Sequence, residues 1–137
     1  MGKIAFVFAG QGAQYPGMGR DLCQNFGAAR RVFEQADAIR AGTSRQCFEG
    51  TEEELKETKN TQPCMFAVEM AAAAVLSSEG LRADMTAGFS LGELAALTYA
   101  GAMDFATGFR LVKRRGELMQ KASELYPTAM AAVPSGP

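Results

Sequence analysis

Residues 84–101, DMTAGFSLGELAALTYAG, place a serine between two glycines where a short strand meets a helix. In this G-x-S-x-G pattern the glycines permit tight strand–helix packing, and a strained turn exposes the hydroxyl of Ser90. The backbone N–H of Leu91 then lies at a helix start, where negative charge is stabilised. The alternative is that Ser90 only caps the helix. A nucleophilic serine normally needs a histidine base, and the sequence contains no histidine.

Strands and helices are predicted in an α/β order. The apolar run IAFVF (4–8) predicts a buried strand of a parallel sheet, DMTAG (84–88) a second strand, and AMAAV (129–133) a third. Crossovers between these strands are expected to be helical.

Capping residues predict where several of the helices begin. Thr51 and Glu54 have capping-box spacing, and Asp104 is expected to cap a helix that reaches about Leu125. Thr61 is expected to cap a helix that is apolar on nearly all sides, with Pro63 near its first turn. Further helices are expected over 20–40, with a break near Gly27, and over Leu91 to Tyr99.

Composition excludes several classes of function. The formal net charge is -1, so bulk charge gives no case for nucleic acid or an anionic membrane. The short apolar N-terminal run is unsuited to a membrane span or a signal peptide. Three widely spaced cysteines without histidine argue against a metal site and suit a cytoplasmic protein.

A glycine-rich loop, AGQGAQ (9–14), follows the first predicted strand, where ligand loops of α/β sheets lie. It is not a dinucleotide fingerprint, because Tyr15 stands where the third glycine would be. It is not a phosphate-binding P-loop either, since no G-K-[ST] follows. The alternative is an ordinary glycine-rich turn.

Arg115 is the second candidate site residue. On a helical wheel it falls within an apolar stripe, among Leu111, Val112, Leu118, Met119 and Ala122. A buried arginine is costly unless it is paired. Either an internal carboxylate or a bound anionic ligand would satisfy it, and the nearby serine motif favours the ligand.

Together these motifs resemble malonyl-CoA:acyl carrier protein transacylases and the related acyltransferase domains of fatty-acid and polyketide synthases. The resemblance rests on five motifs in family order: FVFAGQGAQYPGMG, NTQP, GFSLGELAAL, RLVKRRGELMQ and AMAAV. It implies an α/β fold with a parallel sheet, the α/β-hydrolase-like acyltransferase core.

The resemblance also implies a function and its site residues. A malonyl group would pass from coenzyme A to Ser90 and then to the pantetheine thiol of an acyl carrier protein. The backbone amides of Gln11 and Leu91 would form the oxyanion hole. Arg115 would bind the malonyl carboxylate, and Gln62 would line the site. No permanently bound cofactor or metal is implied, and malonyl-CoA is the substrate.

Two departures from the family pattern stand out. Phe89 occupies the position before the serine where the family usually has histidine, which leaves acyl preference open. The chain is also about half the family length. We therefore expect residues 1–137 to be the N-terminal part of the large subdomain, with 128–137 starting the crossover to the small one. A ferredoxin-like subdomain, the C-terminal half and its histidine base would come from a complementary half or second chain.

Three functions compete. The leading prediction is an enzyme of the acyl carrier protein S-malonyltransferase family, weak or inactive as an isolated chain. The alternative is a non-catalytic module that binds acyl-CoA or a carrier protein. A serine esterase of the α/β-hydrolase type also needs histidine, and it leaves the glycine loop and Arg115 unexplained.

Overall fold

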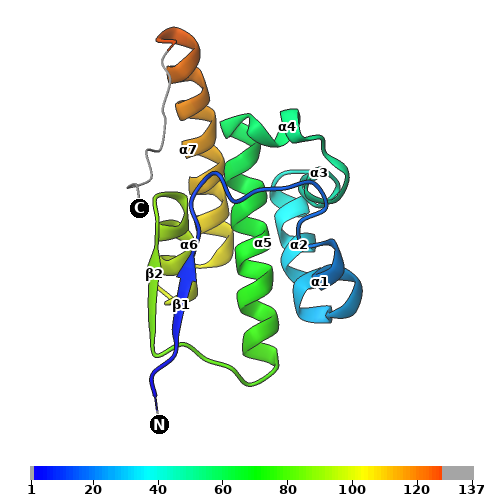
Figure 1. The fold of residues 1–137 in the computed structure, drawn as a ribbon, viewed down its shortest axis with the longest axis vertical. Helices are drawn as coiled ribbons and strands as arrows, with labels where there is room; N and C mark the ends of the chain where they lie inside the picture. The colour runs from blue at the N-terminus through cyan, green and yellow to red at the C-terminus, as the bar shows by residue number, and fades with distance from the viewer. Residues whose placement is uncertain (1, 128–137) are drawn as a thin grey trace, which may run out of the picture.

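The computed structural model describes residues 2–127 and shows a helix-rich α/β arrangement (Figure 1). The elements in chain order are β1 (Ala5–Phe8), α1 (Arg20–Asn25), α2 (Gly27–Ile39), α3 (Thr43–Glu49), α4 (Glu52–Lys56), α5 (Thr58–Ser78), β2 (Met85–Gly88), α6 (Leu91–Tyr99) and α7 (Phe105–Leu125). The predicted α/β class and parallel sheet are confirmed. The predicted strand at 129–133 lies outside the described residues.

Strands β1 and β2 pair in parallel, with Ala5 opposite Met85 and Phe8 opposite Gly88. Helix α6 packs on one face, where the Tyr99 ring lies 5.1 Å from the ring of Phe6. The other face is open among the described residues, and Val7 is 77% exposed. The prediction of a buried strand is therefore wrong for β1 among the described residues, because helices cover only one of its faces.

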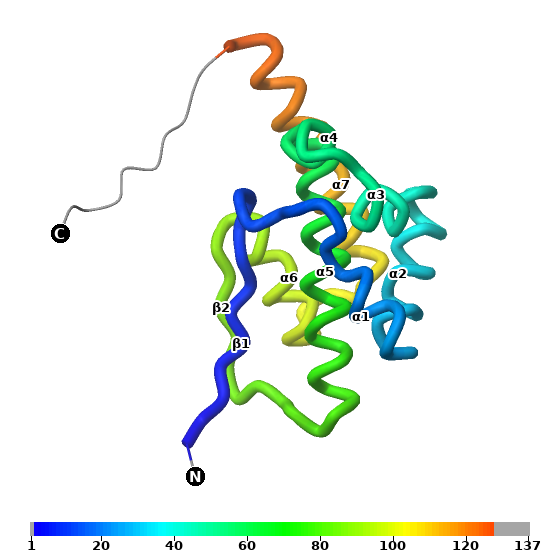
Figure 2. Tube along the Cα trace, turned by 45° about the vertical axis from the view of Figure 1, so that its right-hand side comes forward, coloured from blue at the N-terminus to red at the C-terminus, as the bar shows by residue number. Residues whose placement is uncertain are grey.

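Helix α5 runs through the middle of the molecule. The strand pair and α6 lie on one side of it, and α1, α2 and α3 lie on the other (Figure 2). Its middle is apolar on most sides, as predicted, and Phe66 is fully buried against the rings of Phe105 and Phe109. Helix α5 therefore contacts each of the other helices of the described residues.

The start of α5 was predicted wrongly. The helix begins at Thr58, so Thr61 is not its cap and Pro63 lies inside it. The Thr61 hydroxyl instead donates to the carbonyl of Glu57 at 3.1 Å and also bonds to that of Leu55. This early start carries Gln62 into the helix interior. The capping residues Thr51 and Asp104 are as predicted, whereas α3 was not predicted.

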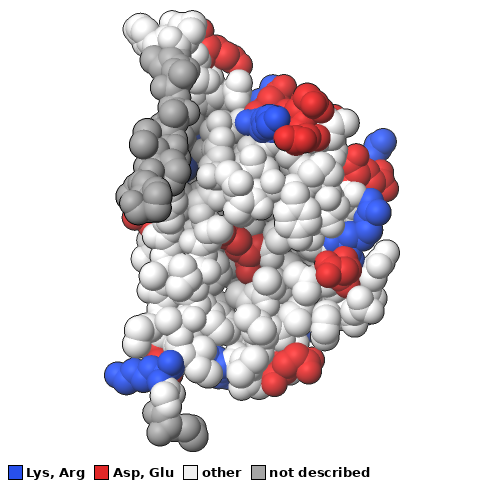
Figure 3. Space-filling view, viewed as in Figure 1, with Lys and Arg blue, Asp and Glu red and all other residues white. Residues whose placement is uncertain are grey.

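Charged side chains lie mainly around the rim of the face seen in Figure 3, over α4 and the outer helices. Between them the visible surface carries few charges. Within residues 2–127, none of the helices combines the length and the hydropathy that crossing a bilayer requires.

Candidate active site

Ser90 occupies a sharp turn between β2 and α6. Its backbone has φ 55° and ψ -104°, and it is the one non-glycine residue with positive φ among residues 2–127. Such a conformation costs about 1–3 kcal/mol and persists only where its surroundings impose it. The side chain is exposed rather than folded back as a helix cap. The predicted strand-to-helix turn with an outward hydroxyl is therefore present.

The two glycines of the motif are required by close backbone contacts. A Cβ on Gly88 would lie 2.1 Å from the carbonyl oxygen of Gly92. A Cβ on Gly92 would lie 2.2 Å from the carbonyl oxygen of Phe8. Helix α6 can approach both strands this closely only because no side chain intervenes. The strained residue Ser90 lies between these two close contacts.

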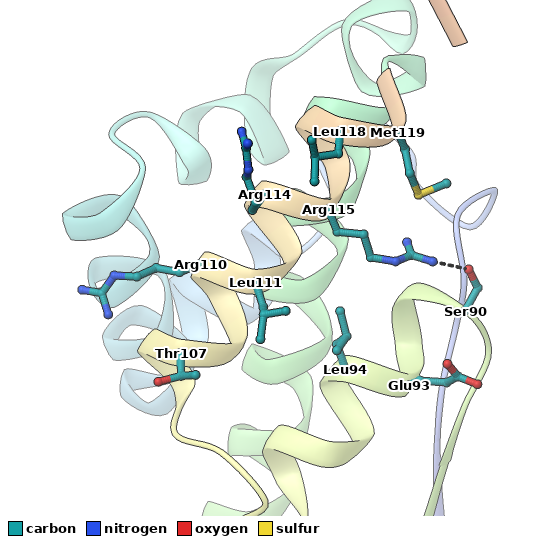
Figure 4. A pocket seen from close by; sticks show the side chains of 10 residues that line it. All are labelled: Ser90, Glu93, Leu94, Thr107, Arg110, Leu111, Arg114, Arg115, Leu118 and Met119. Carbon is teal, nitrogen blue, oxygen red and sulfur yellow. Dashed lines mark hydrogen bonds between the residues drawn. The ribbon is translucent and has the colours of Figure 1, made fainter. Parts of the chain in front are cut away.

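Arg115 reaches from α7 to the serine. Its Nη2 donates to the Ser90 Oγ at 3.0 Å, drawn as the dashed line in Figure 4. Its Nη1 donates to the Oε1 of Gln62 at 2.8 Å. Among residues 2–127, no carboxylate lies within ion-pair distance of Arg115. The internal-carboxylate alternative is therefore not what the structure shows.

Gln62 fixes the direction of that guanidinium. Its side chain is fully buried, and its Nε2 also contacts the sulfur of Met119 at 3.1 Å. A buried amide with both ends engaged has little freedom to rotate. Gln62 from α5 thus holds Arg115 of α7 in reach of Ser90.

A cavity of about 690 Å³ opens beside Ser90 between α6 and α7. Figure 4 shows Arg115 pointing toward the serine, while Arg110 and Arg114 point away from it. The remaining lining is largely apolar and comprises Leu94, Leu111, Leu118 and Met119, with Glu93 and Thr107 at its edge. Of the three arginines that line this hollow, Arg115 is the one that faces the serine.

The glycine-rich loop after β1 lies next to the serine turn. A Cβ on Gly10 would meet the Phe89 ring at 2.6 Å and the Phe89 carbonyl oxygen at 2.9 Å. The Gln11 side chain donates to the hydroxyl of Thr58, at the start of α5, at 3.1 Å. The structure thus brings together the four regions that contain Gln11, Gln62, the Ser90–Leu91 pair and Arg115.

Sequence analysis missed Glu69 of α5. Both of its carboxylate oxygens are buried without a hydrogen-bond partner among residues 2–127. Burial raises the pKa of Glu69 from 4.5 to about 8, and the neighbouring backbone N–H of Ala9 lowers it in part. A signal was present in the sequence, because Glu69 is the single charged residue in the apolar run at 61–76.

Comparison with known proteins assigns the family. Residues 5–135 match the acyl transferase domain family. The malonyl CoA-acyl carrier protein transacylase of Bacillus subtilis (strain 168) is 42% identical over 134 residues, which are 97% of this chain and 42% of that protein. The chain therefore spans less than half the length of this relative.

Solved structures of similar proteins share the fold. The malonyl-CoA:ACP transacylase of Synechocystis sp. PCC 6803 superposes with a TM-score of 0.84 at 44% identity, over 88% of this chain and 41% of that one. A malonyl-transacylase solved with a type II polyketide synthase acyl carrier protein gives 0.83 at 39% identity, over 88% and 40%. The chain thus belongs to the acyl transferase domain family and is similar to the N-terminal part of malonyl-CoA:acyl carrier protein transacylases.

Proposed function

We propose that this chain carries the nucleophile of an acyltransferase that moves a malonyl group from coenzyme A to the pantetheine thiol of an acyl carrier protein. The observation that carries the proposal is the exposed, strained Ser90 with a guanidinium 3.0 Å from its Oγ. A serine ester would be the intermediate, so the transfer takes two steps that share one site. No permanently bound cofactor takes part, and malonyl-CoA enters as substrate.

The backbone amides of Gln11 and Leu91 are proposed as the oxyanion hole. Leu91 is the first residue of α6, so its N–H is one of the unpaired donors at a helix start. Gln11 follows Gly10, which packs directly against the serine turn. Donors fixed before the reaction stabilise the charge that develops on the thioester oxygen.

Arg115 is proposed to bind the free carboxylate of the malonyl group, with Gln62 holding the guanidinium in place. A carboxylate accepts two parallel hydrogen bonds from a guanidinium, whereas the Ser90 hydroxyl accepts one. The lining beside Arg115 is largely apolar but open to solvent, so water partly screens this pairing.

A base for Ser90 must come from elsewhere, because the 137 residues contain no histidine. We propose a complementary half, on the same or a second chain, which supplies that histidine and covers the open face of β1. Residues 1–137 would then be the N-terminal part of the large subdomain. Phe89 makes the position before the serine apolar. Ser90 loading with malonyl, methylmalonyl and acetyl thioesters would measure the acyl preference.

The second candidate is a non-catalytic module that binds acyl-CoA or a carrier protein. The absence of histidine favours it, because Ser90 contacts a cation rather than a base. In that case Arg115 would bind the malonyl carboxylate, but no ester with Ser90 would form.

Intact-mass spectrometry tests the two candidates. The chain is incubated with malonyl-CoA, alone and with the histidine-bearing C-terminal portion of a close relative. We expect one malonyl group per chain in the mixture, none with Ser90→Ala, and full loading with the exposed control Ser78→Ala. Loading that survives Ser90→Ala would exclude the serine ester. Malonyl-CoA binding without any ester in the mixture would establish the binding module.

A further inference from the structure

Glu69 is an ionisable group that the proposed transfer does not use. Its carboxylate oxygens have no hydrogen-bond partner among residues 2–127, although both are buried. Leaving a charged carboxylate in such a place is unfavourable, so the neutral acid is preferred. Burial is the main cause of its raised pKa, and the Ala9 amide is the other contributor. No charged side chain of the described residues contributes to it.

The position of Glu69 links it to the glycine-rich loop. The N–H of Ala9 faces the carboxylate, while the Ala9 carbonyl oxygen lies 2.6 Å from where a Cβ on Gly92 would be. The Ala9 peptide is therefore held between α5 and α6. Two residues later, the Gln11 side chain bonds to Thr58, also on α5. The loop is thus bonded to α5 after Gly10, through Gln11, and lies beside the unpaired Glu69 carboxylate before Gly10.

We propose that Glu69 is a positioning residue, whose neutral carboxyl group lets the loop Ala9–Gln11 lie against α5 and whose ionisation displaces that loop. An ionised carboxylate requires N–H donors, and the nearest is the amide of Ala9. When the proton leaves to solvent, the loop must turn toward Glu69 or water must enter. Either change moves the amide of Gln11.

The consequence for acyl transfer rests on the proposed function, because it assumes that the Gln11 amide stabilises the oxyanion. A negative charge behind the loop would also repel that oxyanion. In the parent, the rate of Ser90 acylation should therefore fall as pH rises through about 8. In a variant whose residue 69 cannot ionise, this fall should be absent. The displacement of the loop does not depend on acyl transfer and can be measured without it.

The experiment is a pH titration of backbone amides by ¹H–¹⁵N NMR on the 137-residue chain. We expect the amides of Ala9, Gly10 and Gln11 to shift with a midpoint near 8 in the parent. The chain has no histidine to titrate nearby. In Glu69→Gln, which resembles the neutral acid, the three amides should stay at their low-pH positions. The control Glu79→Gln removes an exposed acid at the end of the same helix and should keep the parental titration.

Two results would overturn the proposal. One is a titration of the three amides that persists in Glu69→Gln, since the α-amino group or a thiol would then be its cause. The other is a Glu69 carboxyl whose pKa stays at the ordinary value of 4.5. If Glu69→Gln does not fold, Glu69→Leu gives the same test, because it cannot ionise either. Hydrogen–deuterium exchange of the segment 5–15 against pH is a second readout. If the loop amides titrate with Glu69 but no Ser90 ester forms, the positioning role of Glu69 stands and the proposed transfer is rejected.

Discussion

Arg115 donates to Ser90 across 3.0 Å although 25 residues separate them in sequence. The same guanidinium is held at its other nitrogen by the buried amide of Gln62. A hydroxyl is a weaker partner for a guanidinium than a carboxylate is. A carboxylate on an acyl group would therefore be a stronger partner for Arg115 than the Ser90 hydroxyl is.

Replacing Arg115 with alanine should abolish the preference for malonyl over acetyl groups. A hydrogen bond to a charged group contributes ~1.5–3 kcal/mol. At ~1.4 kcal/mol per tenfold, the ratio of malonyl to acetyl loading should fall by roughly one to two orders of magnitude. The measurement is Ser90 loading with each thioester in the presence of the histidine-bearing half. Arg45→Ala, an exposed arginine of α3 that pairs with Glu49 and does not line the cavity, is the control and should leave the ratio unchanged. An unchanged ratio in Arg115→Ala would refute the selector role.

Replacing Ser90 with glycine should stabilise the fold. The positive φ of Ser90 costs about 1–3 kcal/mol, and glycine adopts that conformation freely. Part of the gain is offset by the greater freedom of glycine in the unfolded chain, so we expect a net gain of about 1 kcal/mol. Urea denaturation provides the measurement. Ser90→Ala removes the same hydroxyl but keeps the Cβ, so it should show no gain. Equal stability of the two variants would mean that the turn is not strained.

Replacing Gly92 with alanine should destabilise the protein by about 1–3 kcal/mol or more. The added Cβ would lie 2.2 Å from the carbonyl oxygen of Phe8, and backbone cannot move aside as a flexible side chain can. Gly27→Ala is the matched control, because its Cβ meets only the ends of arginine side chains. Urea midpoints of the two variants should differ clearly. If Gly92→Ala were as stable as Gly27→Ala, the close contact between α6 and β1 would be wrong.

The stability of the fold should decrease as pH rises from about 4.5 to about 8 because of Glu69. Below this window both the folded and the unfolded chain hold the proton. Within it the unfolded chain releases the proton while the folded chain retains it, so folding loses up to about 1.4 kcal/mol per pH unit. Above pH 8 this contribution is fully lost.

Thermal melting at pH 5 and pH 8 measures this dependence on Glu69. The decrease in melting temperature between the two values should be smaller in Glu69→Gln than in the parent. Glu79→Gln, which removes an exposed acid, should retain the parental decrease. The same decrease in all three proteins would show that Glu69 ionises normally.

Much of the site could be predicted because its geometry is local. The serine turn needs only a strand, two glycines and a helix start, all contiguous in sequence. The helix wheel placed Arg115 among apolar residues, and the structure places it in a largely apolar cavity. Capping chemistry at Thr51 and Asp104 likewise depends on residues three positions away.

The remaining features depend on contacts between distant residues. The contact between Gln62 and Arg115 requires the packing of α5 on α7, which no local pattern reveals. Thr61 has good capping chemistry, but the helix starts at Thr58 and the hydroxyl bonds to carbonyls instead. Glu69 is the single charged residue of its apolar run, yet its relation to Ala9 follows only from the fold. The roles of Gln11, Gln62, Ser90, Leu91 and Arg115 stay predictions.

The backbone contacts from Gly88 to Gly92 and from Gly92 to Phe8 contain no side chain that could yield. Inserting or deleting a residue between Met85 and Gly92 would break these backbone contacts, because they fix the length of the segment. Length variation among related sequences is therefore expected to be absent from the serine turn.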